Sequence, residues 1–170
     1  NPKVLDLACG SGCIGISIAK TLKHCNVVLS DICDECIEIA KKNILINDVK
    51  SNCYTIKSDL FSKIEGKFDV IVSNPPYIPM HEYISLDKQV SDYEPKLALL
   101  AGDEGTEFYE SISLTAKYYL NNKGYILFET GYNQAFKVAK ILKKQGYSEI
   151  QIFKDMQGID RIVIAKQSMM

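Results

Sequence analysis

The chain has 170 residues, of which 46% are hydrophobic, a proportion normal for a globular domain that argues against disorder. This length suits one domain with a real core and is too short for two ordinary ones. Twenty Lys and Arg residues against 21 Asp and Glu residues leave a formal net charge of −1. This balance argues against a protein that binds nucleic acid mainly through its phosphates. No apolar run has the length of a bilayer span, so we expect no membrane association.

Apolar runs alternate along the chain with stretches of helical periodicity. Seven runs predict β-strands, at residues 4–8, 27–31, 54–56, 68–73, 125–129, 147–153 and 161–165. The helical stretches cover residues 14–22, 33–46, 108–119 and 133–145, and we expect Gly124 and Gly146 to end the last two. Residues 80–104 follow neither pattern, and we expect them to be irregular.

These elements define a fold class. Near-continuous apolar strands that alternate with helices predict a parallel sheet covered on both faces. The last two strands have no helix between them, so they should form an antiparallel hairpin at one edge. We therefore expect an α/β domain with a doubly wound, mostly parallel seven-stranded sheet and a C-terminal antiparallel hairpin, which is a Rossmann-like fold.

All six cysteines lie in the first third of the sequence. Cys33 and Cys36 have the spacing of half a zinc site, but Cys9 and Cys13, the nearest candidates for the other half, straddle a glycine loop. We therefore expect no metal site. Reduced thiols are the better interpretation, and they are typical of a cytoplasmic protein.

The glycine loop follows the first strand, in the sequence VLDLACGSGCIGI. Gly10 and Gly12 permit a tight turn and a close approach of the backbone to a ligand. Ala8 stands where a dinucleotide-binding loop has its first glycine. Asp6, two residues earlier, would repel a pyrophosphate but suits the ammonium of a methionyl group.

Two more acids follow the next two strands. Asp31 lies 19 residues past Gly12, the place of an acid that accepts both hydroxyls of a ribose. Asp59 could accept from an adenine amino group, with Leu60 packed near the ring. Because the carboxyl ends of parallel strands meet at one edge, the three acids favour a nucleoside ligand. The simpler alternative is that Asp6 and Asp31 only cap the helices that follow them.

These residues resemble the cofactor motifs of class I S-adenosylmethionine-dependent methyltransferases. The resemblance implies S-adenosylmethionine as cofactor, S-adenosylhomocysteine as product, and no metal. The cofactor-binding residues we expect are Asp6, Ala8, Cys9, Gly10, Ser11, Gly12, Asp31, Ile32, Asp59, Leu60 and Asn74.

The fourth strand ends abruptly in Asn74-Pro75-Pro76-Tyr77. A planar amide or exocyclic amino nitrogen is a poor nucleophile, because its lone pair is delocalised. The Asn74 side-chain oxygen and the Pro75 carbonyl could accept both of its N–H hydrogens, direct it at the sulfonium methyl and stabilise the developing positive charge. The prolines would hold that carbonyl in place, and Tyr77 could stack on the planar group. The alternative is a rigid turn with Asn74 bonded locally and Tyr77 in the core.

Three further stretches identify the kind of methyltransferase. SDLFSKIEGKFDVIVSNPPYIP, YEPKLALLAGDEGTEFYESI and GIDRIVIAKQ closely resemble the peptide chain release factor glutamine methyltransferase family (HemK/PrmC), and the match extends over residues 4–166. The resemblance implies a role in translation termination: methyl transfer to the side-chain amide of the glutamine in the Gly-Gly-Gln loop of a release factor. The catalytic residues would be Asn74, Pro75, Pro76 and Tyr77, and Glu94-Pro95 would wall the substrate pocket.

Other functions stay open at this point. Asn-Pro-Pro-Tyr also occurs in enzymes that methylate adenine N6 in nucleic acid, and a close relative methylates a glutamine of a ribosomal protein. Residues 80–104 hold six acids against two lysines, which favours a protein substrate and no direct nucleic acid contact. A third possibility is a cofactor sensor without catalysis, for which Asn74→Ala would change nothing.

The resemblance also sets expectations for the whole chain. The family has a small helical domain before the methyltransferase fold, and this chain starts at Asn1, directly before its first strand. We therefore expect residues 1–170 to be the methyltransferase domain of a longer protein, and we expect a monomer. Asp160 and Arg161 should order the start of the C-terminal hairpin.

Overall fold

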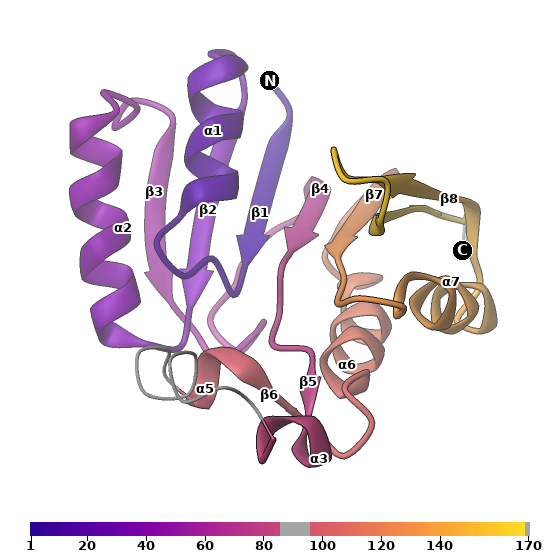
Figure 1. Ribbon diagram of the computed structural model, residues 1–170. Helices are drawn as coiled ribbons and strands as arrows, with labels where there is room; N and C mark the ends of the chain where they lie inside the picture. The colour runs from indigo at the N-terminus through magenta and orange to yellow at the C-terminus, as the bar shows by residue number, and fades with distance from the viewer. Residues whose placement is uncertain (86–95, 169–170) are drawn as a thin grey trace.

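The structure is a computed structural model that describes residues 1–85 and 96–168. Its main feature is a seven-stranded sheet with the order β3-β2-β1-β4-β7-β9-β8 (Figure 1). The strands are β1 (Lys3–Leu7), β2 (Asn26–Asp31), β3 (Cys53–Lys57), β4 (Phe68–Ser73), β7 (Leu120–Glu129), β8 (Tyr147–Lys154) and β9 (Asp160–Gln167). β1, β2, β3, β4 and β7 are parallel, whereas β9 runs antiparallel to both β7 and β8. The predicted fold class is confirmed.

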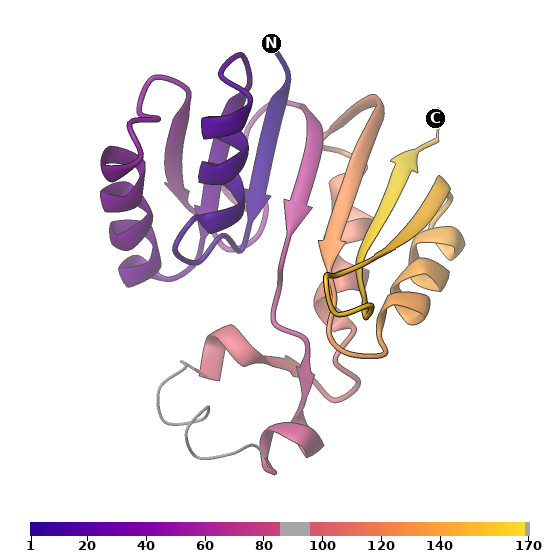
Figure 2. The ribbon, with the colours of Figure 1, turned by 45° about the horizontal axis from the view of Figure 1, so that its top comes forward.

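Helices cover both faces of this sheet. They are α1 (Cys13–Thr21), α2 (Asp34–Ile46), α6 (Glu107–Ala116) and α7 (Ala135–Lys144). In Figure 2, α1 and α2 lie in front of the strands and α6 lies behind β7. Two apolar clusters match this division: one contains residues of α1 and α2, the other residues of α6 and α7. No helix in residues 1–85 and 96–168 combines the length and apolar character needed to cross a membrane.

The first strand lies inside the sheet, between β2 and β4. Its residues alternate between the two clusters, with Val4 facing α1 and α2 and Leu5 in the cluster of α6 and α7. Leu5 and Leu7 are fully buried. Burying one such side chain contributes about 1.5–3 kcal/mol, so the strand that carries the glycine loop at its end is firmly fixed.

Two predicted boundaries in the second half are wrong. β7 begins at Leu120 rather than at residue 125, and α6 ends at Ala116. Gly124 does not end a helix; it lies buried inside β7, where a Cβ would come within 2.9 Å of the Asn121 carbonyl oxygen. The sequence hides this stretch because Asn121-Asn122-Lys123 is polar and the pairing with β4 shifts register between Phe68 and Val70.

The prediction of irregular structure at residues 80–104 is also wrong in part. β5 (Ile78–Pro79) pairs in parallel with β6 (Leu100–Gly102), and two short helices, α3 (Met80–Tyr83) and α5 (Lys96–Leu99), lie beside them. We call residues 78–85 and 96–105 the insertion; Figure 2 shows it beyond the carboxyl ends of the strands. Elements of two to four residues are too short to show a periodicity. Glu94-Pro95 lies outside the described residues.

Candidate cofactor and substrate site

Residues 8–12, here called the glycine loop, connect β1 to α1 in a left-handed conformation. Ala8, Gly10 and Gly12 have φ angles of 57°, 54° and 82°. At Gly12 a side chain would also lack space, because its Cβ would lie 2.8 Å from Leu29 Cδ1. At Ala8 the left-handed conformation costs an L-residue roughly 1–2 kcal/mol. Ala8, which stands where dinucleotide-binding loops have their first glycine, therefore has a backbone conformation that favours glycine.

Asp6 lies beneath this loop. Its side chain is 1% exposed, and its Oδ2 accepts a hydrogen bond from the Gly15 N–H at 2.8 Å, within the first turn of α1. Burial raises the pKa of Asp6 to about 7; the Gly15 hydrogen bond opposes this rise and the nearby Asp31 adds to it. The structure thus shows a helix-capping interaction for Asp6, and its contact with a methionyl ammonium stays a prediction.

Gly15 is a residue of the site that sequence reasoning missed. A Cβ there would lie 2.2 Å from Leu29 Cδ2 and 2.9 Å from Asp6 Oδ2. The Asp6 carboxylate can reach the helix backbone only because this position has no side chain. A glycine inside a helical apolar pattern, which costs about 1 kcal/mol relative to Ala, was the available signal.

Asp31 joins the glycine loop to the start of α2. Its Oδ2 accepts from the Gly10 N–H at 2.8 Å and its Oδ1 from the Cys33 N–H at 2.9 Å. Ile32, beside it, is 45% exposed. The Ser58 N–H donates to the Asp31 carbonyl at 2.9 Å, which brings the end of β3 to the same place.

The remaining predicted cofactor residues differ in exposure. Asp59 is exposed, and Leu60 is half-buried against the cluster of α6 and α7. Cys9 is buried, and burial, together with Asp6 and Asp31, raises the pKa of its thiol, so the thiol stays neutral. Ser11 is exposed; its carbonyl accepts from Asn43 Nδ2 at 2.9 Å. Asn43, on α2, thus holds the loop from its far side, and sequence reasoning did not single it out.

The Asn74-Pro75-Pro76-Tyr77 segment, here called the corner, starts beside the glycine loop. Leu7 and Ser73 are register partners at the ends of β1 and β4, and Ser73 Oγ donates to the Leu7 carbonyl at 2.6 Å. The next residues along the chain are Ala8 and Asn74. The predicted cofactor and substrate segments therefore leave the sheet side by side, although more than sixty residues separate them in sequence.

The corner combines one exposed side chain with a fixed backbone. Asn74 is exposed, Pro75 is buried, and Pro76 and Tyr77 are half-buried. Tyr77 packs against the cluster of α6 and α7 and lies so close to Gly131 that a Cβ there would be 2.7 Å from Tyr77 Cδ2. Tyr77 therefore belongs partly to the core, as the alternative of a purely structural turn predicts. The exposed polar side chain of the corner is that of Asn74.

The comparison with protein families identifies the chain. A family model described as the methyltransferase small domain matches residues 1–91 of the 170. The chain belongs to this family. It is also 43% identical over 169 residues to a release factor glutamine methyltransferase of Fusobacterium nucleatum, covering 98% of this chain and 48% of that protein. Identity to a release factor glutamine methyltransferase of Clostridium botulinum is 39% over 168 residues, covering 97% and 59%. The chain thus spans about half the length of these relatives, and the resemblance drawn from the sequence is confirmed.

Solved structures of methyltransferases share the fold. A methyltransferase from Pyrococcus furiosus superposes with a TM-score of 0.73 at 23% identity, covering 99% of this chain and 76% of that one. The Thermus thermophilus 16S rRNA N2 G1207 methyltransferase, solved with AdoMet and guanosine, has a TM-score of 0.67 at 16% identity, covering 98% and 38%. At these identities the likeness shows the methyltransferase fold and leaves the substrate open.

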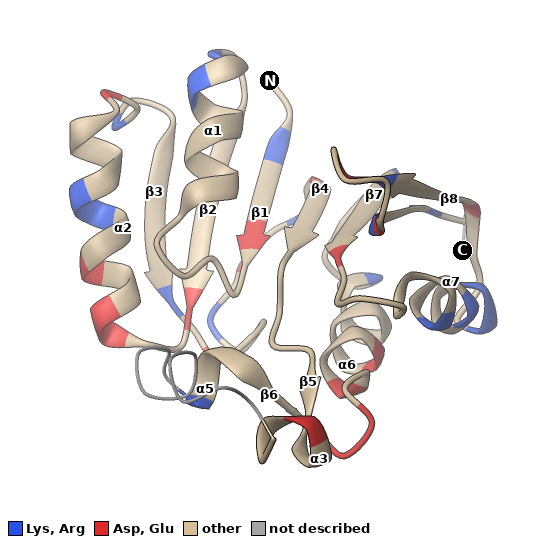
Figure 3. Cartoon of the chain, viewed as in Figure 1, with Lys and Arg blue, Asp and Glu red and all other residues tan. Residues whose placement is uncertain are grey.

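Charge is distributed unevenly around this methyltransferase site. Figure 3 shows acidic residues at the carboxyl ends of β1 and β2, on α3 and just before α6, whereas α7 is basic. The acids of β1 and β2 are Asp6 and Asp31, and those of the insertion include Glu82, Asp103 and Glu104. The insertion therefore brings negative charge to the corner's side of the molecule.

The C-terminal hairpin is ordered by ion pairs, as expected for Asp160 and Arg161. Asp160 pairs with Lys154 at 2.9 Å, and Arg161 Nε lies 3.5 Å from Asp155. Arg161 also donates to the Thr130 carbonyl at 3.1 Å, just past the end of β7. This prediction is confirmed.

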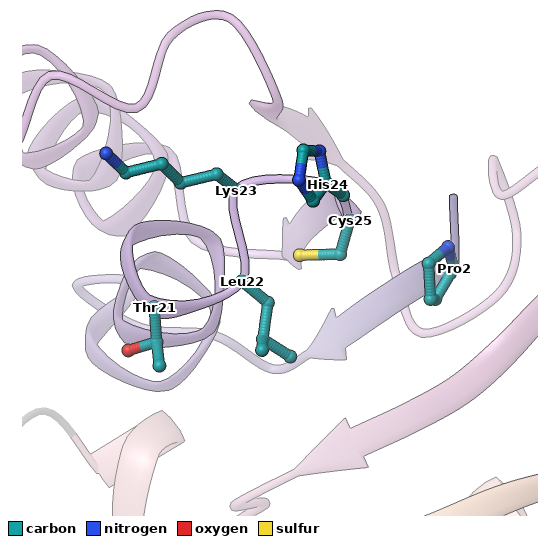
Figure 4. Close-up of a pocket in the computed structure, with 6 residues that line it drawn as sticks. All are labelled: Pro2, Thr21, Leu22, Lys23, His24 and Cys25. Atoms are coloured by element: carbon teal, nitrogen blue, oxygen red, sulfur yellow. The ribbon is translucent and has the colours of Figure 1, made fainter.

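A hollow of about 450 Å³ lies at the opposite end of the strands (Figure 4). It is lined by Pro2, Thr21, Leu22, Lys23, His24 and Cys25. These residues precede β1 and connect α1 to β2, so the hollow is at the amino ends of the strands, away from the glycine loop and the corner. It belongs to no part of the predicted site.

Proposed function

We propose that this methyltransferase transfers the methyl group of S-adenosylmethionine to the side-chain amide nitrogen of the glutamine in the Gly-Gly-Gln loop of a peptide chain release factor. The observation that carries the proposal is the start of the corner directly beside the glycine loop, through the Leu7–Ser73 pairing. Relatives named release factor glutamine methyltransferase, at 43% and 39% identity, support the choice of substrate.

The residues at the ends of β1 and β2 fit S-adenosylmethionine, which when bound supplies an electrophilic methyl group on a sulfonium. A carboxylate offers about four acceptor positions. Asp31 uses two for backbone N–H groups, which leaves room for the two hydroxyls of a ribose. Gly12 sits where any side chain would collide with Leu29, so the loop packs closely on the core and needs glycine there. Asp6 lies below the loop with a pKa raised to about 7, so its carboxyl gains a negative charge, which suits a positively charged ligand, as the pH rises through that value.

The corner supplies the groups that hold the acceptor nitrogen. The Asn74 side-chain oxygen and the Pro75 carbonyl accept the two hydrogens of the glutamine amide, which turns its nitrogen toward the methyl group. As positive charge develops on that nitrogen, the two fixed oxygens stabilise it. Pro75 and Pro76 have fixed φ angles, so the carbonyl loses little entropy on binding. The nitrogen gives up its proton after methyl transfer, so the chain needs no strong base.

Methyl transfer from labelled S-adenosylmethionine tests this proposal. The acceptors are a release factor, the same factor with its loop glutamine replaced by alanine, and double-stranded DNA. We expect label on the intact factor alone. Label on DNA would instead make this an adenine methyltransferase, and equal label on both factor variants would exclude the loop glutamine as the target.

Binding of S-adenosylmethionine, measured by calorimetry, is the companion experiment. If this chain binds the cofactor but labels no acceptor, the assay is repeated with a form extended to the full length of its relatives. The reason is that this chain spans only about half of their length. If the extended form also fails to label the factor, the proposed substrate is wrong.

A further inference from the structure

The side chain of Gln134 connects three segments that are far apart in sequence. Its Nε2 donates to the Tyr77 carbonyl at 2.9 Å and to the Gly105 carbonyl at 3.4 Å. Its Oε1 accepts from the Gly131 N–H at 3.2 Å. One neutral amide therefore ties the corner to the end of the insertion and to the turn after β7.

Two glycines make room for this arrangement. At Gly105, with φ of 76°, a Cβ would lie 2.6 Å from the Tyr77 carbonyl oxygen and 2.8 Å from Gln134 Nε2. At Gly131 a Cβ would lie 2.7 Å from Tyr77 Cδ2 and 2.8 Å from Gln134 Oε1. A side chain at either glycine would collide with the same two residues, Tyr77 and Gln134. The close packing of the three segments at this contact therefore depends on glycine at both positions.

The corner needs such an anchor because of its composition. Pro75 and Pro76 have no N–H and so cannot be fixed by donating backbone hydrogen bonds. The first backbone group after them with a side-chain partner is the Tyr77 carbonyl. A carboxamide offers a donor and an acceptor in one rigid plane, which no charged side chain does. Gln134 itself is half-buried and lies directly before the start of α7, a helix that packs against the core.

We propose that Gln134 is a positioning residue for methyl transfer. By holding the Tyr77 carbonyl, it fixes the backbone that presents the Pro75 carbonyl and the Tyr77 ring to the substrate amide. This inference rests on the function proposed above. A misplacement of about 1 Å at a reacting group can reduce the rate about a hundredfold, so losing the anchor should lower kcat. It should leave cofactor affinity unchanged, because the hydrogen bonds of Gln134 go to residues 77, 105 and 131 and not to the glycine loop.

Two variants and a control test the role. Gln134→Leu removes both hydrogen-bonding functions, whereas Gln134→Glu keeps the acceptor for Gly131 and places an ionised oxygen against two carbonyl oxygens. A protonated glutamic acid can donate again, so its activity should return as the pH falls. Lys137→Ala changes an exposed residue in the first turn of α7, the helix that Gln134 precedes, and serves as the matched control.

The expected results are specific. For Gln134→Leu we expect kcat to fall about tenfold to a hundredfold at every pH, with an unchanged dissociation constant for S-adenosylmethionine. For Gln134→Glu we expect a similar loss at pH 8 and partial recovery, relative to the parent chain, below about pH 6. Lys137→Ala should behave as the parent. Loss of stability with an unchanged kcat of the folded protein, or a parallel loss of cofactor affinity, would overturn the positioning role.

Hydrogen exchange separates this inference from the proposed function. In Gln134→Leu, the amides of Asn74, Tyr77 and Ile78, the residues of the segment 74–79 that have an N–H, should exchange faster than in the parent, and those of residues 9–13 should not change. This readout needs no turnover. If neither the parent chain nor its extended form labels a release factor, the proposed function fails, but exchange still decides whether Gln134 fixes the corner. Unchanged exchange at Asn74, Tyr77 and Ile78 would show that it does not.

Discussion

The glycine loop and the corner leave the sheet side by side but are held by different forces. Two carboxylates hold the loop: Asp6 binds the backbone of α1, and Asp31 binds the loop itself and the start of α2. A neutral amide, that of Gln134, holds the corner against two close-packed glycines. The segment expected to bind a cation is thus supported by two acidic side chains, and the segment expected to grip a neutral amide is supported by a side chain that carries no charge.

This difference has a practical consequence. Substitutions in the corner should change turnover far more than cofactor binding, whereas changes around the loop should affect stability, its pH dependence and cofactor binding. The predictions below test that division, starting with the largest effect.

Removing the Asn74 amide should have the largest effect on turnover. We expect Asn74→Ala to lower kcat about a hundredfold to a thousandfold, the usual cost of losing one fixed group that stabilises developing charge. The dissociation constant for S-adenosylmethionine should change much less than kcat, because Asn74 is one of many residues expected at the cofactor and the loop is held by other residues. Steady-state kinetics together with calorimetry check both halves. A large loss of cofactor affinity would mean that the two segments do not act separately.

Filling the space at Gly15 should break the loop's support. In Gly15→Ala the new methyl group would collide with Leu29 and with Asp6 Oδ2. We expect a loss of about 3 kcal/mol in the free energy of unfolding, at the upper end for an overpacked core, and weaker cofactor binding. Urea unfolding measures the first. Ser17→Ala, at an exposed position of the same helix, is the control; equal stability of the two variants would contradict the packing argument.

The pH dependence of stability should report Asp6. Its native pKa is about 7 against an ordinary value of 3.8. Between these values the native carboxyl keeps its proton while the unfolded one loses it, so the native state binds more protons and stability falls as the pH rises. Each pKa unit corresponds to about 1.4 kcal/mol, which gives a loss of roughly 2 kcal/mol between about pH 5 and pH 7.

Asp6→Asn isolates this effect, because its side-chain oxygen can still accept from Gly15 while the titration disappears. Urea unfolding of the parent and the variant at pH 5, 6 and 7 should show a smaller slope in the variant. Equal slopes would mean that the Asp6 pKa is not raised.

Relieving the backbone at Ala8 should give the smallest change. Glycine adopts a φ of 57° without strain, which favours Ala8→Gly by roughly 1–2 kcal/mol, but glycine also makes the unfolded chain more flexible, which costs about 0.4–1 kcal/mol. We expect a net gain in stability of between about 0 and 1.6 kcal/mol. Thermal unfolding checks the sign, and a lower melting temperature would show that the loop depends on the Ala8 side chain.

The part of this account that the sequence predicted depends on local pattern. The buried strands, α1, α2 and the glycine loop were recognisable because apolar periodicity and glycine spacing are properties of short stretches. The nearness of the loop and the corner also followed, since parallel strands bring their carboxyl ends to one edge. The start of β7 was missed because Asn121-Asn122-Lys123 carries no apolar pattern.

The parts that could not be predicted are contacts between distant segments. Gln134 and Tyr77 are 57 residues apart, and nothing around either of them indicates the other. Gly15 and Asn43 likewise acquire their roles only when α1 and α2 pack beside the loop. The sequence indicated candidate groups for substrate contact more readily than the groups that hold those segments in place.

The most direct test of the central claim is to locate the transferred methyl group. A release factor is incubated with S-adenosylmethionine and either the parent chain or Asn74→Ala, and the factor is then sequenced by tandem mass spectrometry. The account predicts a methyl group on the side-chain amide of the Gly-Gly-Gln glutamine with the parent chain and almost none with the variant, which still binds the cofactor. A methyl group on another residue, or equal methylation by the variant, would contradict it.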